Sequence, residues 1–397
     1  MVRNRWLKFL LLYLGGVIVS LSQLKLVPIQ NELGQTLGVS LSLVSWLMSI
    51  FTVSGIFLAI PGGTLVTRFG PKKLLMGLMG CLAIGNVWGA FTHDFWSLLI
   101  SRAIEGISFS MIIMVGIVLI NFWFKEGNSG IATGIWGTFS ALGSMLAMNL
   151  FKSLSQAYGL RSLWLVIAGV SLLLLCLYLF LLDEPTSRSI AKEKENNGSF
   201  KKAIENKAIW WLALAQGCMA FILFAFINLY PQIYIQQYGL SEVLANRYTG
   251  YFGLFGIPFG ALAGYLIDKT KKGKMIIFCS FVLMLVATLW MGFLSSNFTF
   301  IAQLFALSAG ASLASSCVMI LAPKVVKQEQ LIGASISFIN LFYYVGIFIG
   351  TPLVTKVSES SESWSMAIYL LGGVGLLAVF AILGFIKMSK KNENLLV

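Results

Sequence analysis

The strongest constraint on this chain is a series of apolar runs, each roughly twenty residues long and nearly free of charge. About 20 apolar residues are what an α-helix needs to cross the hydrocarbon core of a bilayer. Only 11% of the 397 residues are charged, whereas a soluble globular domain has roughly 25%. A water-soluble fold is therefore excluded, and an all-α membrane protein is predicted. Twelve transmembrane helices are expected, at residues 6–29, 41–66, 73–92, 96–121, 129–151, 162–182, 208–231, 243–267, 275–295, 299–322, 330–355 and 364–387.

The basic residues lie mostly in short connections between the runs and indicate how the chain is oriented. With the amino terminus placed inside, 22 Lys and Arg residues fall on the cytoplasmic side and 4 fall outside. Cytoplasmic loops of membrane proteins carry such an excess. We predict a multi-pass protein of the cell membrane with both termini in the cytoplasm. The net charge of +13 is then a topology signal, and no nucleic-acid partner is expected.

The longest polar connection, residues 183–207, carries 11 charges in 25 residues and separates six spans from six. It predicts an N-terminal bundle at 1–182, a cytoplasmic linker at 183–207 and a C-terminal bundle at 208–397. Two segments recur across this linker. Lys25-Leu-Val-Pro28 returns as Asn228-Leu-Tyr-Pro231 at an offset of 203, and residues 63–73 return at 264–274 at an offset of 201. We expect two pseudo-symmetric halves that arose by duplication.

The repeated loop segment also carries a family resemblance. Gly63-Thr-Leu-Val-Thr67-Arg68-Phe-Gly70-Pro-Lys72-Lys73 resembles the motif GxLaDRxGRR of the major facilitator superfamily of secondary transporters, and the resemblance covers the whole chain. It implies two six-helix bundles that work by alternating access. It also implies that the motif residues gate the cytoplasmic side, here Gly63, Arg68, Gly70, Lys72, Gly264, Asp268 and Lys269. The first copy has Thr67 at the family's acidic position, which predicts a weaker lock in the first half.

Two further segments bear on the branch of that family. Residues 123–134 are similar to a segment common in nitrate, cyanate, oxalate and sugar-acid porters. Drug/proton antiporters of the family carry a proline motif, GxxxGPxxGG, in the fifth span, and residues 134–143 contain no proline. A porter of small solutes is therefore favoured, and efflux of drug-like or toxic compounds is the alternative.

Three ionisable residues lie inside the predicted spans: Lys25, Arg102 and Glu105. Such residues are costly in hydrocarbon and are functional candidates by default. In the resembled fold, spans one and four line the central cavity, so the three side chains are expected to meet. Lys25 and Arg102 would bind an anionic substrate, and Glu105 would carry the coupling proton. The alternatives are that Lys25 extends to the membrane surface and that the Arg102–Glu105 pair, spaced i, i+3, is purely structural.

Neutral side chains supply the remaining candidates. Trp136, between Gly134 and Gly137, would stack on the substrate or else fill the space that the glycines leave. Polar and aromatic groups on the seventh span and near the middle of the eleventh would contact the organic body of the substrate, and we assign this role to Asn228, Tyr230, Asn340, Tyr343 and Tyr344.

The sequence thus predicts a secondary transporter of a small organic or inorganic anion, coupled to protons. A membrane-embedded enzyme or receptor is disfavoured, because the spans contain no clustered His, paired Asp or Ser/His arrangement. The expected partners are a small-molecule substrate, protons and the lipid bilayer. We expect no cofactor and no metal, and we expect a monomer.

Overall fold

A computed structural model describes residues 5–125, 127–183, 204–326 and 331–390. In these ranges the chain is helical and contains no strand. Twelve helical segments are long and apolar enough to cross a membrane, which confirms the predicted fold class. By contacts the chain divides into two units, Met1–Lys194 and Glu195–Val397. The boundary falls within the predicted linker, of which residues 184–203 lie outside the described ranges.

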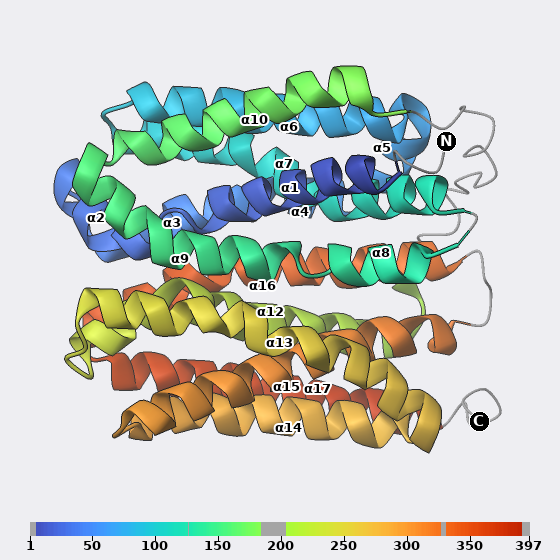
Figure 1. The fold of residues 1–397 in the computed structure, drawn as a ribbon. Helices are drawn as coiled ribbons and strands as arrows, with labels where there is room; N and C mark the ends of the chain where they lie inside the picture. Colours follow the sequence, from blue (N-terminus) through green and yellow to red (C-terminus); the bar gives the residue numbers. More distant parts are fainter. Residues whose placement is uncertain (1–4, 126, 184–203, 327–330, 391–397) are drawn as a thin grey trace. The chain divides into compact units, whose positions relative to one another are not determined.

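The first unit holds six of the spanning segments, several of them interrupted (Figure 1). Its helices are α1 (Arg5–Leu24), η2 (Val27–Ile29), α2 (Gln30–Leu37), α3 (Leu41–Ser49), η3 (Ile50–Thr52), α4 (Val53–Leu58), α5 (Gly62–Phe69), α6 (Pro71–Phe91), α7 (Phe95–Trp123), α8 (Ser129–Trp136), α9 (Phe139–Tyr158) and α10 (Arg161–Leu181).

The first span breaks where Lys25 stands. A turn at Lys25 and Leu26 separates α1 from η2, and Pro28 at the start of η2 has no N–H to continue the helical ladder. The chain then resumes as α2 through Leu37, beyond the predicted end at residue 29. The predicted span ends too early because polar residues follow residue 29, including Glu32. In the structure the Glu32 carboxylate accepts hydrogen bonds from Lys152 and Ser155 of α9.

The second and fifth spans are broken as well. The second is divided into α3, η3 and α4, and Pro61 precedes α5. The fifth is interrupted between Trp136 and Phe139, where the hydroxyl groups of Thr138 and of Tyr13 on α1 form a hydrogen bond at 2.8 Å. The apolar runs predict the extent of these spans, but such a run does not reveal where the helical ladder is interrupted.

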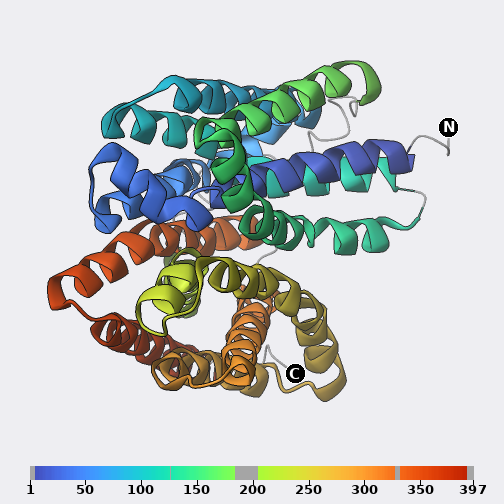
Figure 2. The same cartoon turned by 60° about the vertical axis from the view of Figure 1, so that its left-hand side comes forward.

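Close approaches at glycines hold the helices of the first unit together. A Cβ at Gly106 of α7 would overlap the carbonyl of Phe51 in η3, and a Cβ at Gly143 of α9 would crowd Ser20 of α1. Figure 2 shows α1, in dark blue, running among the other helices of this unit. The backbones approach because small residues at helix contacts allow it, as is usual in membrane bundles.

The second unit holds the other six spans, five of them as continuous helices of 27–30 residues and the sixth as a helix of 18 residues that ends in a 3-10 turn. They are α12 (Lys207–Gln236), α13 (Glu242–Thr270), α14 (Gly273–Trp290) with η5 (Met291–Phe293), α15 (Asn297–Val325), α16 (Ile332–Ser361) and α17 (Trp364–Lys390). Gly346 and Gly350 bring α16 against the α12 backbone at Gly217 and Phe221. Pro231, the repeat partner of Pro28, lies inside α12 without ending it.

Candidate functional site

The three charged residues of the spans meet inside the first unit. Lys25 Nζ lies 2.8 and 2.9 Å from the two carboxylate oxygens of Glu105, and Arg102 Nη1 lies 2.6 Å from Oε2 of the same group. All three side chains are 0% exposed. The structure thus places Lys25 in the interior, and the alternative in which it extends to the membrane surface is wrong.

Two neutral side chains complete the hydrogen bonding of this charge cluster, which we define as Ser22, Lys25, Asn86, Arg102 and Glu105. Ser22 donates to Glu105 at 2.7 Å, and Lys25 donates to Asn86 Oδ1 at 2.6 Å. Asn86 Nδ2 donates in turn to Ser22 at 3.3 Å. The bonds form a closed ring that joins α1, α6 and α7.

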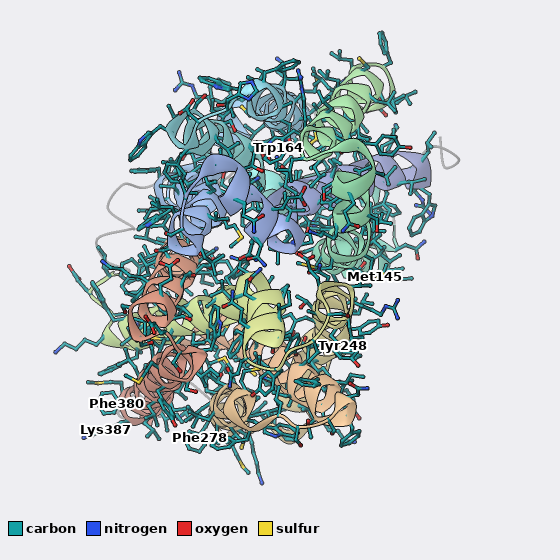
Figure 3. The ribbon with its side chains drawn as sticks, turned by 90° about the vertical axis from the view of Figure 1, so that its left-hand side faces the viewer. Met145, Trp164, Tyr248, Phe278, Phe380 and Lys387 are labelled. Carbon is teal, nitrogen blue, oxygen red and sulfur yellow. The ribbon has the colours of Figure 1, made fainter. Side chains whose placement is uncertain are left out.

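Aromatic faces cover the two cations of the cluster. Lys25 Nζ lies 4.6 Å from the centroid of the Trp164 ring on α10, and the guanidinium carbon of Arg102 lies 4.4 Å from that of Phe51 in η3. Trp164 lies in the first unit (Figure 3). Cation–π contacts of this kind strengthen when water is excluded, so the rings help to compensate the lost hydration of both cations.

Arg102 also binds the backbone at the breaks of two spans. Its guanidinium donates to the carbonyls of Ser22 at 2.7 Å and Gln23 at 3.1 Å, next to the end of α1. Its Nε donates to the carbonyl of Leu47 at 3.1 Å, just before η3. Carbonyls at helix ends lack their intrahelical donors, and Arg102 supplies them. In this conformation the guanidinium therefore faces protein groups, and the bidentate contact to substrate predicted from the sequence requires its release.

Glycines on α6 make room for the cluster. A Cβ at Gly85 would lie 2.6 Å from Cγ of Glu105, and a Cβ at Gly89 would overlap the indole edge of Trp164. Sequence reasoning missed Ser22, Asn86 and Trp164 because it searched the spans for charge. The signal available was an asparagine between two glycines, Gly85-Asn86-Val-Trp-Gly89, inside an apolar run.

The cluster carries a net charge of +1, from two cations and one carboxylate. Buried ions are tolerated when they are paired and hydrogen-bonded, and removing one partner of such a pair costs about 3–5 kcal/mol. The described residues contribute no second carboxylate to the cluster. The site therefore retains an excess positive charge, a property suited to an anion.

Trp136 packs between glycines of two neighbouring helices. It is 2% exposed, and its ring touches the positions where Gly16 of α1 and Gly116 of α7 would carry a Cβ. Its centroid lies 4.6 Å from that of Phe139. Among the described residues its indole N–H finds no partner. The contacts are those of the packing alternative, and stacking on a substrate would require this aromatic wedge to withdraw.

The polar candidates of the second unit form separate pairs. Asn228 donates to Thr351 of α16 at 2.9 Å, and Tyr230 donates to Gln303 of α15 at 3.0 Å. Tyr230 is fully buried in an aromatic group. The remaining candidates lie on α16, where Asn340 and Tyr343 are partly exposed and Tyr344 is buried; the two tyrosine rings lie 5.7 Å apart.

The first copy of the loop motif is explained by local structure. Gly70 ends α5 and precedes α6 with φ 80° and ψ 147°, a backbone region that only glycine adopts readily. Lys72 donates to the carbonyls of Leu179 at 3.2 Å and Leu182 at 2.7 Å, at the end of α10. Arg68 is exposed beside the Phe69 ring. Lys72 therefore caps a helix of its own unit. The remaining position, Gly63, lies in α5.

The second copy is looser. Gly264 lies on α13 facing Ile320 of α15, and Asp268 is exposed near the end of α13. Lys269 donates to the hydroxyl of Tyr265 at 3.0 Å. Helix α13 ends at Thr270, and Lys271 follows with φ 55°. The residue with positive φ after the helix is therefore a lysine in this copy and Gly70 in the first.

Among the described residues no group of three His, Cys, Asp or Glu side chains is placed to hold a metal ion.

Twelve helical segments long and apolar enough to span a membrane, six in each unit, define a polytopic membrane protein, and the first unit holds a buried charge cluster. The sequence pattern of the Major Facilitator Superfamily matches residues 12–351, and the chain belongs to this family. It is a secondary transporter and a multi-pass membrane protein.

Two relatives and one solved structure resemble this chain over most of its length, at low sequence identity. The chain is 22% identical over 391 residues to the human lysosomal dipeptide transporter MFSD1, covering 92% of this chain and 83% of that one. It is 22% identical over 400 residues to the hexuronate transporter of Bacillus subtilis, covering 95% and 94%. A crystal structure of a mutant of the nucleoside transporter NupG superposes with a TM-score of 0.79 at 13% identity, covering 94% and 99%, and so shares the fold.

Proposed function

We propose that this transporter takes up a small organic anion together with protons across the cell membrane. The observation that carries the proposal is the buried cluster in which two cations share one carboxylate, leaving a net charge of +1. Lys25 and Arg102 are the substrate-binding cations, and Glu105 is the proton carrier. Uptake by alternating access, with both termini in the cytoplasm and the chain acting as a monomer, belongs to the same proposal.

Charge balance gives the coupling. In the state described here, Glu105 is the counterion of both cations through bonds of 2.6–2.9 Å. A proton on Glu105 removes this negative charge and leaves two buried cations, which is unfavourable unless another anion replaces it. Proton binding therefore favours substrate binding, and by linkage the substrate favours proton binding to the same extent. A monoanion moved with one proton is an electroneutral pair.

Two relatives support the class of substrate. One is named as a hexuronate transporter, and a hexuronate is a monoanion; another is named as a dipeptide transporter, and a dipeptide carries a carboxylate beside its ammonium group. We assign contacts with the organic part of the substrate to Trp136 and to the second-unit residues Asn228, Tyr230, Asn340, Tyr343 and Tyr344. The loop residues Gly63, Arg68, Gly70, Lys72, Gly264, Asp268 and Lys269 are proposed to gate the cytoplasmic side.

Transport by the purified protein in liposomes tests the proposal. Glucuronate, a dialanine dipeptide and a lipophilic cation are offered separately, with either a pH gradient or a membrane potential imposed. We expect acid-outside gradients to drive accumulation of glucuronate, the monoanion of the panel, while the potential alone does not drive it. Transport of the lipophilic cation only would overturn the proposal in favour of efflux.

Single variants test which residue carries the coupled proton and which residue binds the anion. Glu105→Gln should abolish acceleration by the pH gradient, and Lys25→Met should weaken anion uptake. Lys152→Met is the control, because Lys152 pairs with Glu32 outside the cluster, with side chains 14% and 32% exposed. Proton-driven uptake that persists in the Glu105 variant would remove this residue from the mechanism.

A further inference from the structure

We infer that Asn86 is a positioning residue, which holds the Lys25 ammonium in place while Glu105 gains and loses its proton. The inference rests on the proposed function for the proton cycle, whereas the contacts that carry it belong to the structure alone. Asn86 is 0% exposed and lies on α6, facing Lys25 of the broken first span.

The amide of Asn86 has a defined orientation. Its Nδ2 donates to the carbonyl of Leu82 at 2.8 Å and to Ser22 at 3.3 Å. These bonds turn Oδ1 toward Lys25 Nζ, which lies 2.6 Å away. An ammonium has only donors to offer, so the oxygen of the amide is the half that suits this place.

The surrounding turn of α6 fixes the asparagine against the cluster. Gly85 admits Glu105 of α7 on one side, and Gly89 admits Trp164 of α10 on the other. Trp164 covers the Lys25 ammonium with its ring. One turn of α6 thus contacts the carboxylate, the ammonium and the aromatic cover together.

Glu105 faces charged groups on two elements only, within the described residues: Lys25 beyond the end of α1 and Arg102 on α7. Helix α6 contributes Asn86 and α10 contributes Trp164, and neither of these ionises. When Glu105 takes a proton, Asn86 remains an acceptor for Lys25 because an amide keeps its carbonyl oxygen at any pH. Lys25 therefore stays oriented while the net charge of the cluster changes.

Replacing Asn86 by Asp tests this assignment, because the change keeps the shape and adds one negative charge beside Lys25. The cluster would become neutral overall, so anion binding should need one additional proton to restore the net charge of +1. At pH 7 we expect glucuronate affinity to fall about tenfold or more, which corresponds to about 1.4 kcal/mol. The loss should shrink as the pH is lowered.

Calorimetry in buffers of different ionisation enthalpy counts the protons taken up with each glucuronate. The Asn86→Asp variant should take up about one more proton per anion than the wild type. Asn149→Asp is the matched control, because Asn149 makes the same bond to the carbonyl four residues earlier, at 2.8 Å to Met145, and is exposed on α9 outside the cluster. An unchanged proton count in the Asn86 variant would overturn the inference.

A second measurement needs no substrate. Asn86→Leu should lower the melting temperature of the otherwise unchanged protein, and the shift should be clearly smaller when Lys25 is already Met. Equal shifts in the two backgrounds would mean that Asn86 does not act on Lys25. If the wild type binds no carboxylate compound, the proposed function fails. The comparison of melting temperatures in the two backgrounds still tests whether Asn86 acts on Lys25.

Discussion

Removing the carboxylate of the charge cluster should destabilise the protein more than removing one of its two cations. Glu105→Gln removes the carboxylate that accepts bonds from Ser22, Lys25 and Arg102 at 2.6–2.9 Å. Two buried cations would remain without a counterion, and loss of a buried partner costs about 3–5 kcal/mol. Lys25→Met leaves Arg102 and Glu105 as a neutral pair. Its cost should be lower, about 1.5–3 kcal/mol, the value of hydrogen bonds to charged groups.

The double variant sharpens the test. With both Lys25→Met and Glu105→Gln, Arg102 would be the one cation left, still bound to three backbone carbonyls. The double variant should therefore be more stable than the sum of the single costs implies, with a coupling of about 1–3 kcal/mol.

SDS titration of the purified protein in mixed micelles, followed by circular dichroism, measures the apparent free energy of unfolding. Lys152→Met is the control and should cost about 0–1 kcal/mol, because Lys152 belongs to a partly exposed ion pair. Costs of the two cluster variants that add to within about 0.5 kcal/mol, or a Glu105→Gln variant as stable as the control, would refute the electrostatic reasoning.

Three further changes test packing and capping by the same unfolding assay. Gly106→Ala should destabilise by about 1–3 kcal/mol, because its Cβ would overlap a backbone carbonyl of η3; Gly77→Ala, which meets nothing within 4 Å, should be neutral or stabilising. Lys72→Met should cost about 1 kcal/mol and speed hydrogen exchange at the end of α10. Lys73→Met, which removes an exposed lysine, is the control, and equal exchange rates in the two variants would contradict the capping role of Lys72. Tyr230→Phe should cost about 1–3 kcal/mol by leaving a buried glutamine oxygen unsatisfied, and wild-type stability would show that the bond contributes nothing.

The repeat in the sequence predicted similar halves, and the structure shows how they diverged at one pair of positions. Pro28 stands at a break of the first span, whereas Pro231 lies within the continuous helix α12. At the cluster, Lys25 corresponds to Asn228, which binds Thr351. Counting prolines could not tell the two cases apart, because membrane helices tolerate a proline where neighbouring groups compensate for the lost hydrogen bond. At the break of the first span Arg102 binds the carbonyls of Ser22 and Gln23.

The sequence by itself determined the class and the number of spans, because the thickness of a bilayer sets the length of every apolar run. It also identified Lys25, Arg102 and Glu105 as candidates, because charged residues are rare in membrane spans and are usually functional there. The family resemblance already implied that these three side chains meet. Only the tertiary structure decided that all three are fully buried, that Asn86 and Ser22 complete the cluster, that Trp164 covers Lys25, and that the guanidinium of Arg102 binds the carbonyls at broken helix ends. These partners are neutral side chains and backbone carbonyls on other helices, so no local pattern of residues distinguishes them from the ordinary contents of a membrane span.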